Sequence, residues 1–400
     1  MDKQNQHSPF VNVFCRELRR MVSRRIYFVA CVVLPLFSIF FMATIFGNGQ
    51  MENLPVGIVD MDASATSRKI SRMVEAVPTF RVTNYYTDAA EARAATERKE
   101  IYGYLVIPNE FEAHLQDGKT AALTYYFHYA LLSVGEEIQG AFEHLLQTVA
   151  VSPVVMQAVA LGVEPSQVET FLLPVSSQDH PLFNPDMNYS IYLTYPFCFI
   201  FLQVLLLLVT TYALGSESKF HTADEWMQTA NGNILIAVLA KLLPYTLLFM
   251  IMSLVANYFF FGIMDIPFAC GFLSLNGIAF LFVLSTQALA IFLYSLFPAL
   301  SLVISVVSMV GSLGATLSGV TFPVPYMYVP VYYTSFLFPV RHFVELGQTL
   351  LYGNYGFAYM WQGIVALLLF LLPALGILPR LKRTCLLYTS DAADDLIGVD

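Results

Sequence analysis

The chain alternates long uncharged apolar runs with one charge-rich block, and this pattern predicts its organisation. The first run, Ile26–Phe46, is long enough to cross a bilayer as a helix, which takes about 20 residues. The charged block 47–188 follows it. The later apolar runs are Ile191–Leu214, Ile234–Ile263, Phe268–Leu296, Leu300–Thr321 and Ala358–Leu378. We therefore expect a polytopic α-helical membrane protein with six transmembrane helices, one before the block and a five-helix core over residues 189–379.

Composition and charge distribution agree with this pattern. Hydrophobic residues make up 57% of the 400 residues and charged residues only 12%, whereas a soluble domain carries about 25% charged residues. This composition argues strongly against a soluble globular enzyme, because a folded surface needs more charge than this to stay in solution. Of the 49 charged residues, 26 lie in block 47–188 and only 8 in residues 189–379. The block is thus expected to be a water-exposed domain.

Basic residues at the two ends predict the orientation. Residues 1–25 hold six Lys or Arg, and Arg380, Lys382 and Arg383 follow the last apolar run in the short basic end 380–384. Since cytoplasmic flanks are enriched in Lys and Arg, both termini are expected in the cytoplasm and block 47–188 outside it. No cysteine lies in that block, so its fold must depend on its own core rather than on disulfides.

The order of expected strands and helices in block 47–188 is typical of an α/β domain. The expected strands are Leu54–Val59, Ile101–Ile107 and Leu123–Tyr129, and the expected helices are 64–76, 88–100, 111–116 and 134–161, the last with a break near Pro153. Asp60 and Asp62 are more typical of helix caps than of a metal site. No complete phosphate loop, metal-ligand spacing or catalytic constellation occurs, so we expect no catalytic, cofactor or metal site in this chain.

Residues 1–25 predict a basic amphipathic helix. Phe10, Phe14, Leu18, Met21 and Val22 recur at helical spacing. The interleaved basic residues, expected at the membrane surface, are Arg16, Arg19, Arg20, Arg24 and Arg25. A helix on the inner membrane face and a simple positive-inside anchor both fit this pattern.

Among the expected cytoplasmic segments, the loop 215–233 has the residues best suited to contact a partner. It carries acidic residues beside Phe220, Trp226 and Met227, which suits a short helix that docks on a partner. An interfacial helix with Trp226 in the aromatic belt fits the same residues. Lys241, near the start of the third run, is expected to reach the inner membrane interface with its amine.

Small residues and broken helices characterise the stretch from 300 to 352. Gly311, Ala315 and Gly319 recur every fourth residue, a spacing that lets helices approach closely, at a subunit interface, at a gate or within the bundle. Residues 322–352 are rich in Pro, Tyr and Phe and predict short helices at the outer interface. Arg341 and Glu345, one helical turn apart, are expected to pair.

These segments together resemble the permease subunit of ABC-2 type exporters over residues 1–384. The matching stretches are Leu54–Ser64, Tyr104–Phe111, Leu115–Gly118, Glu217–Trp226 with Ala240–Pro244, Ser318–Gly319, Phe322–Pro323 and Phe338–His342. One departure is Phe220-His221, which stands where many members carry glycine.

The resemblance implies a transport function for a subunit without its own ATPase site. Two permeases pair, as identical copies or as paralogues, and each docks on a cytoplasmic ATPase that holds ATP and Mg²⁺. The residues implied in ATPase coupling are Glu217, Lys219, Thr222, Glu225 and Trp226. Those implied in an outer re-entrant region are Pro323, Pro339, Arg341, His342 and Glu345. The implied cargo is amphipathic small molecules or lipids, moved out across the bacterial inner membrane.

Partners and alternatives follow from the same resemblance. The external domain is similar to the multidrug-efflux branch, which implies a periplasmic adaptor beside the lipid bilayer and no nucleic acid. The alternative is a non-transporting envelope-assembly or phage-receptor-like membrane protein with the same external domain. Residues 385–400 resemble the translation of a sequencing adapter, and we expect them to be a non-native tail.

Overall fold

The computed structural model describes residues 8–47, 49–117, 119–160, 184, 188–353 and 357–394. The chain forms two compact units. One is helical and contains residues 1–49 and 187–400, and the other contains residues 50–186. Each unit is described by itself.

The helical unit begins with α1 (Pro9–Ser23), which ends at Arg24 where the backbone becomes extended. The first long helix is then built from α2 (Arg25–Phe28), η1 (Val29–Val33) and α3 (Leu34–Ile45). The following helices are η2 (Ser190–Thr194), α9 (Tyr195–Lys219), α10 (Ala223–Thr229), α11 (Ile234–Tyr258), η3 (Phe259–Ile263), α12 (Phe272–Leu296) and α13 (Leu300–Thr316). The last are η4 (Val324–Tyr326), α14 (Val329–Ser335), α15 (Pro339–Gln348), η5 (Thr349–Gly353), α16 (Phe357–Leu369) and α17 (Leu371–Asp394).

Among the described residues, five helices are long and apolar enough to cross a membrane. They are Arg25–Ile45, Ser190–Lys219, Ile234–Ile263, Phe272–Leu296 and Ala358–Arg383. The sixth helix expected from the sequence is the shorter α13, which has 17 residues. At 1.5 Å per residue it is about 25 Å long, somewhat less than the roughly 30 Å of a bilayer core.

Helix α9 extends further than the hydrophobic pattern predicts. The expected loop began at residue 215, whereas the helix continues to Lys219 and contains the buried residue Glu217. The predicted boundary was wrong because it assumed that a charged residue ends the membrane helix. The surrounding side chains instead neutralise Glu217, as described below.

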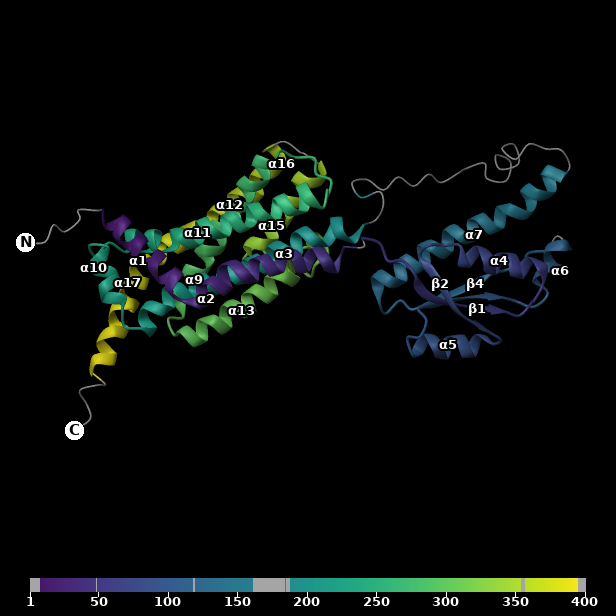
Figure 1. The fold of residues 1–400 in the computed structure, drawn as a ribbon, viewed down its shortest axis with the longest axis horizontal. Helices are drawn as coiled ribbons and strands as arrows, with labels where there is room; N and C mark the ends of the chain where they lie inside the picture. Colours follow the sequence, from purple (N-terminus) through teal and green to yellow (C-terminus); the bar gives the residue numbers. More distant parts are fainter. Residues whose placement is uncertain are drawn as a thin grey trace, which may run out of the picture. The chain divides into compact units, whose positions relative to one another are not determined.

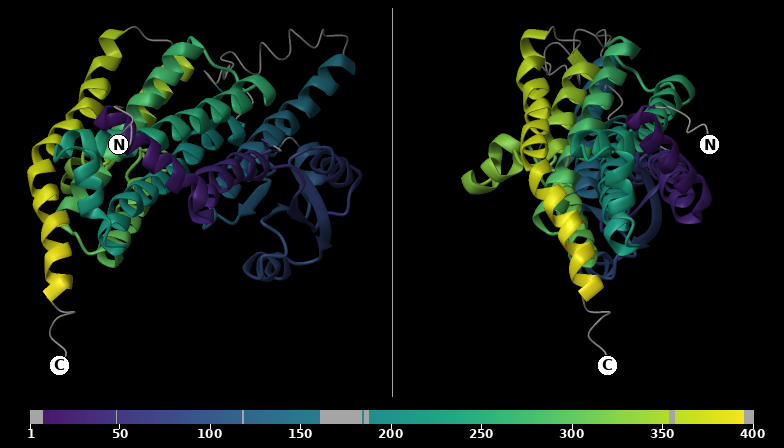
Figure 2. Two further views of the ribbon diagram at one scale, coloured as in Figure 1. Left: turned by 60° about the vertical axis from the view of Figure 1, so that its left-hand side comes forward. Right: turned by 90° about the vertical axis from the view of Figure 1, so that its left-hand side faces the viewer.

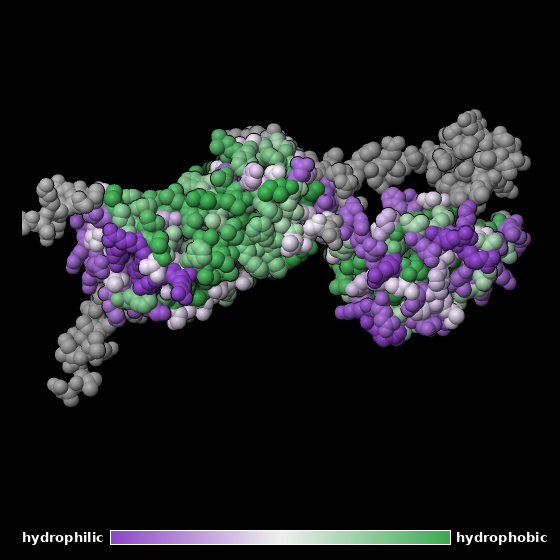
Figure 3. All heavy atoms as spheres, viewed as in Figure 1, coloured by the Kyte–Doolittle hydropathy of each residue, from purple (hydrophilic) through white to green (hydrophobic). Residues whose placement is uncertain are grey.

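The apolar surface of the helical unit corresponds to its candidate spans. Figure 3 shows a broad hydrophobic band over the helices and polar residues gathered at the end where α1 and α10 lie. Figures 1 and 2 show α1 beside α10 at this end of the bundle. The interior is packed with aromatic side chains, for example Phe343, whose ring lies 4.3 Å from that of Phe282 and 4.6 Å from that of Phe199.

The second unit is an α/β domain with a mixed four-stranded sheet. Its strands are β1 (Leu54–Asp60), β2 (Phe80–Tyr86), β3 (Gly103–Ile107) and β4 (Thr124–Phe127), in the order β2-β1-β3-β4. β1 pairs in parallel with β2 and β3, and β4 is antiparallel to β3. Its helices are α4 (Ala65–Glu75), α5 (Ala89–Glu97), α6 (Phe111–Gln116) and α7 (Leu132–Ala160). The domain agrees with the α/β organisation predicted from the sequence, although β2 was not predicted.

Helices cover both faces of this sheet (Figure 1). Apolar residues of α4, α6 and α7 pack with Val56 and Ile58 on one face. Ala92 and Ala95 of α5 pack with Val59 on the other face. α7 continues through Pro153, so the predicted break near that residue is absent.

Asp60 and Asp62 both accept hydrogen bonds from backbone N–H groups, as the capping interpretation expected, but they stabilise different segments. Asp60 Oδ1 accepts hydrogen bonds from the backbone N–H groups of Asp62 and Ala63. Asp62 accepts from the N–H groups of Phe111 and Glu112 and so caps α6 rather than the following helix. The cap of α4 is Ser64, whose hydroxyl accepts from Ser67 N.

The structure does not test the prediction made for the last residues of the chain. Helix α17 runs to Asp394, and residues 395–400 lie outside the described residues. The interpretation of residues 385–400 as a non-native tail therefore stays a prediction.

Candidate functional site

The polar end of the helical unit contains a buried ionic cluster, formed by Glu17, Glu217 and Lys241 together with Arg16 and Arg20. Glu17, Glu217 and Lys241 are each 0% exposed. Lys241 Nζ lies 2.5 Å from Glu17 Oε2 and 2.6 Å from Glu217 Oε1. The cluster therefore joins α1 to α9 and α11, which lie far from it in sequence.

Two arginines of α1 complete the shell around Glu217. Arg16 reaches both carboxylate oxygens, with Nη1–Oε1 at 2.9 Å and Nη2–Oε2 at 3.1 Å. Arg20 Nη1 lies 2.5 Å from Oε1. Such forked contacts are among the stronger hydrogen bonds in proteins. Burial disfavours the charge on Arg16, but hydrogen bonding and attraction from Glu217 and Glu225 raise its pKa above the ordinary value.

The cluster is balanced in charge, and its carboxylates and its ammonium all have hydrogen-bond partners, whereas Arg20 Nε is buried without one. The three cations face the two buried carboxylates and the exposed Glu225, whose Oε1 lies 3.3 Å from Arg16 Nε. Tyr245 donates from its hydroxyl to Glu17 Oε1 at 2.7 Å, and Thr222 donates to Glu217. The ammonium and hydroxyl contacts matter because a buried charge without partners is strongly unfavourable.

The position of Glu217 near the end of α9 adds to its need for cations. The last turn of a helix carries partial negative charge, so a carboxylate there is unfavourable on its own. Lys241, Arg16 and Arg20 supply positive charge at this point. The end of α9 is therefore held to α1 and α11 by electrostatics as well as by packing.

Helix α10 lies against this cluster with its aromatic side inward. Trp226 is 0% exposed, and its Nε1 donates to Ala237 O at 3.2 Å. Lys241 Nζ lies 5.4 Å from the centre of the Trp226 ring. Asp224 and Glu225 are exposed on the opposite side of α10. The side chain of Trp226 is thus part of the core, and the acidic residues form the surface open to a partner.

The residues expected to couple to an ATPase therefore divide into two groups. Glu217, Thr222 and Trp226 belong to the buried cluster or its support. Lys219 and Glu225 are exposed. Their role in coupling stays a prediction, and only the exposed group can touch a partner directly in this conformation.

Helix α1 presents two different faces. Val13 and Glu17 are buried against the bundle, and Phe10, Phe14 and Met21 pack beside them. The exposed apolar face carries Val11, Leu18 and Val22, of which Val22 is 80% exposed. Arg19 and Arg25 are exposed, whereas Arg16 and Arg20 lie in the cluster, and the guanidinium of Arg24 stacks on Phe220 at 4.1 Å.

The prediction that Lys241 extends to the membrane interface is wrong, because its amine is buried between two carboxylates. Glu17 was not singled out from the sequence, although a signal existed. It occupies the helical position between Val13 or Phe14 and Met21, where the rest of the face is apolar. A charged residue on an apolar face indicates a buried partner, since such residues are rarely buried unpaired.

The small residues of α13 pack within the chain. A side chain at Gly311 would meet Val204 of α9 at 2.9 Å, and one at Gly314 would meet Gln203, Phe338 and Val340. Ala315 is only partly buried. Gly319 lies beyond the end of α13 with φ +90°, so it serves the turn rather than a continued stripe.

The predicted outer region consists of short helices, and four of its five named residues share α15. Pro339 begins the helix, and Arg341 and His342 are buried in it. Arg341 Nη1 lies 3.8 Å from Glu345 Oε2, which confirms the predicted pair, and its guanidinium stacks 3.9 Å from the Phe336 ring. Pro323 lies apart, before η4.

Among the residues that the structure describes, no group of histidine, cysteine or acidic side chains has the arrangement of a metal site. Five long apolar helices and a short sixth, with a buried ionic cluster at one end, define a multi-pass membrane protein. The model of the ABC-2 family transporter proteins matches residues 25–378, and the chain belongs to this family. A search of curated proteins gave no significant match.

Family membership gives the chain a role as a transport membrane component and implies association with an ATPase partner. The matched residues include Glu217 and Lys241 but not α1. The α1 half of the ionic cluster is therefore a feature that the family match does not cover.

Proposed function

We propose that the chain is the permease subunit of an ATP-driven exporter that moves amphipathic small molecules or lipids out across the bacterial inner membrane. The termini and α10 then lie in the cytoplasm and the α/β domain outside. The observation that carries this proposal is the buried ionic cluster, which joins α1, α9 and α11 beside the exposed acidic side of α10. A second permease copy or a paralogue completes the transporter.

The cluster is well suited to transmit a displacement of α10, caused by a bound partner, to the helices α1, α9 and α11. Glu225 on α10 contacts Arg16, which also binds Glu217 at the end of α9. Lys241 then connects Glu217 to α11 and to α1. Because buried charges cannot separate without large penalties, a displacement of α10 is expected to move the three helices together.

The docking surface in this proposal is the acidic side of α10, and charge reversal tests it. The permease variant Asp224→Lys, which leaves the contact between Glu225 and Arg16 intact, should lose at least tenfold in co-purification with an ATPase encoded beside its gene. Trp226→Ala is unsuitable for this purpose, because emptying a buried Trp site destabilises by about 3–5 kcal/mol and would unfold the contact region indirectly.

The matched control is Glu52→Lys, which reverses one exposed charge in the α/β domain. It should retain the ATPase. Equal retention by the α10 variant would contradict the docking assignment.

A second experiment tests transport. Co-expression with the ATPase should lower the cellular accumulation of members of a panel of amphipathic compounds, and unchanged accumulation across the panel would count against export of that class.

A further inference from the structure

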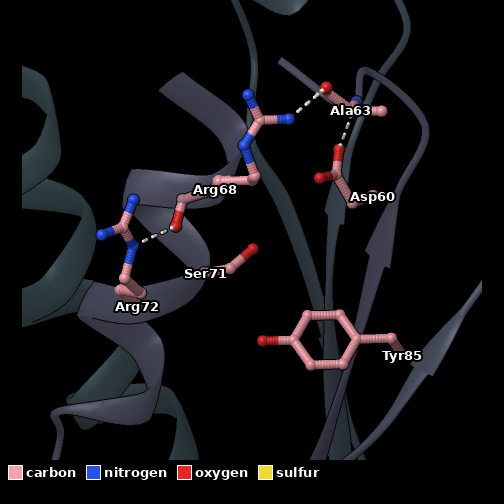
Figure 4. Close-up of a pocket in the computed structure, with 6 residues that line it drawn as sticks. All are labelled: Asp60, Ala63, Arg68, Ser71, Arg72 and Tyr85. Carbon is pink, nitrogen blue, oxygen red and sulfur yellow. Dashed lines mark hydrogen bonds between the residues drawn. The ribbon is translucent and has the colours of Figure 1, made fainter. Parts of the chain in front are cut away.

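The α/β domain contains an open cleft of about 470 Å³ between α4 and the β2 edge of the sheet (Figure 4). The residues that line it are Asp60, Ala63, Arg68, Ser71, Arg72 and Tyr85. None of them takes part in the ionic cluster or in the proposed transport mechanism.

An irregularity in the sheet places Tyr85 at this cleft. Val56 pairs with Val82, but the register shifts after Val56, so Ile58 pairs with Tyr85 instead of Asn84. Val56 and Ile58 face α4, and Tyr85 therefore lies on the same side of the sheet. Figure 4 shows its phenol opposite Ser71 of α4.

The two arginines at the cleft have unused hydrogen-bond donors. Arg68 Nη1 donates to Ala63 O at 2.7 Å, and Arg72 Nε donates to Arg68 O at 3.3 Å. Each guanidinium carries five N–H groups, so most of them remain for another partner. Neither arginine forms a salt bridge with an acidic residue of the described chain.

The acidic groups nearby are, by contrast, already engaged. Asp60 accepts from two backbone N–H groups through Oδ1 and from Ser67 Oγ at 2.7 Å through Oδ2. Glu75 accepts from the hydroxyl of Tyr85 at 2.8 Å. Donors thus exceed free acceptors at the cleft, which favours an anionic occupant.

The local charge differs from that of the rest of the domain. Residues 47–188 carry 18 acidic and 8 basic residues, but residues 68–72 of α4 carry three basic residues and no acidic one. The basic residues of this segment are Arg68, Lys69 and Arg72, and Asp60 is the acidic residue among those that line the cleft. A local reversal of charge beside a cleft attracts anions even though the domain as a whole is acidic.

We propose that this cleft binds a phosphate group, carried by a soluble molecule or by a lipid headgroup, with Arg68 and Arg72 as its ligands. Two guanidinium forks one helical turn apart suit a phosphate, because its oxygens can accept hydrogen bonds from both. Ser71 and Tyr85 line the remaining wall, and their hydroxyls donate to Ser67 O and Glu75 Oε1, so the ligands of the phosphate are the two arginines. This assignment does not depend on the proposed transport function.

The test is calorimetric titration of the full chain in a non-ionic detergent at low salt. Inorganic phosphate represents the soluble source, and dihexanoyl phosphatidylglycerol the lipid source, with dihexanoyl phosphatidylcholine as its zwitterionic counterpart. At least one anionic probe should bind saturably, with a Kd of about 1 mM or tighter. Preference for phosphatidylglycerol over inorganic phosphate would assign the site to lipid headgroups, and the reverse to soluble phosphates.

Three double variants decide whether the binding belongs to the cleft. Arg68→Gln/Arg72→Gln should weaken it at least tenfold, and Arg68→Lys/Arg72→Lys, which keeps the charge but loses the forked donors, should recover only part of it. Arg81→Gln/Lys99→Gln removes the same charge from exposed positions outside the cleft and should change the Kd less than twofold. Absence of saturable binding up to 20 mM (about twenty times the expected Kd), or equal losses in the cleft and control variants, would overturn the proposal.

Discussion

The substitution Lys241→Met tests the buried ionic cluster most directly. Methionine is similar in length and keeps the packing against Trp226, but it removes the ammonium that contacts both Glu17 and Glu217. Glu217 retains Arg16 and Arg20, whereas Glu17 retains only the hydroxyl of Tyr245 among the contacts of the cluster. The main penalty therefore comes from an unpaired carboxylate at Glu17.

The expected size of this penalty follows from the burial of the three groups. Removing one partner of a buried ion pair destabilises by about 3–5 kcal/mol. For a unit of roughly 250 residues, each kcal/mol lowers Tm by roughly 2–4 °C, so the midpoint should fall by about 6–20 °C. The assay is thermal unfolding of the purified full chain in detergent, followed by loss of the monodisperse peak on size exclusion.

A double variant separates loss of charge pairing from loss of packing. Lys241→Met leaves the carboxylate of Glu17 unpaired, and Glu17→Gln removes that carboxylate. The double variant Glu17→Gln/Lys241→Met should therefore be more stable than Lys241→Met alone, with a coupling energy of about 1–3 kcal/mol. The single Glu17→Gln should be milder, since Lys241 keeps Glu217. A fall in Tm below 2 °C for Lys241→Met, or strictly additive effects in the double variant, would refute the reasoning.

Two further substitutions test other parts of the fold. Gly311→Leu should overpack the contact between α13 and Val204 and destabilise by about 1–3 kcal/mol, whereas Gly277→Leu, where no atom lies within 4 Å of the added carbon, should be nearly neutral in the same unfolding assay. Asp62→Ala should lose the cap of α6 and about 0.5–2 kcal/mol, measured by hydrogen exchange of α6 amides. Hydrogen bonds from Ser64 and from the backbone of Glu112 and Phe111 lower the pKa of Asp62. Its contribution is therefore complete above the unfolded pKa and lost as pH falls through the folded value, and equal α6 protection at neutral and strongly acidic pH would contradict it.

Much of the architecture could be predicted from the sequence because it depends on local pattern. The apolar runs predicted the long helices to within a few residues at most ends, since the length of a membrane helix is set by the bilayer. Strands β1 and β3 and the helix Phe111–Gln116 followed from short apolar runs bounded by Asp and Pro. Strand β2 was missed because its apolar and polar residues alternate only from Phe80 to Thr83, and the pattern breaks at Asn84, where the pairing register shifts.

The prediction for the candidate site was less complete, because the site depends on residues that meet across the fold. Glu217 and Glu225 were singled out from one loop, but their partners Arg16 and Arg20 are about 200 residues away in sequence. Trp226 was expected at a surface, and only packing against α11 shows that it is internal. A sequence pattern reports which residues are polar, but not which of them share a buried space.

The sequence by itself therefore determined that this is a membrane protein with an α/β domain inserted after its first long helix. It also determined that charge is scarce in the helical core, because both properties follow from the number and spacing of residue types along the chain. Only the tertiary structure decided that Lys241 joins Glu17 and Glu217, and that Tyr85 faces the two arginines of α4. Such contacts depend on helix docking and strand register, where displacement by a single residue turns a side chain to another face.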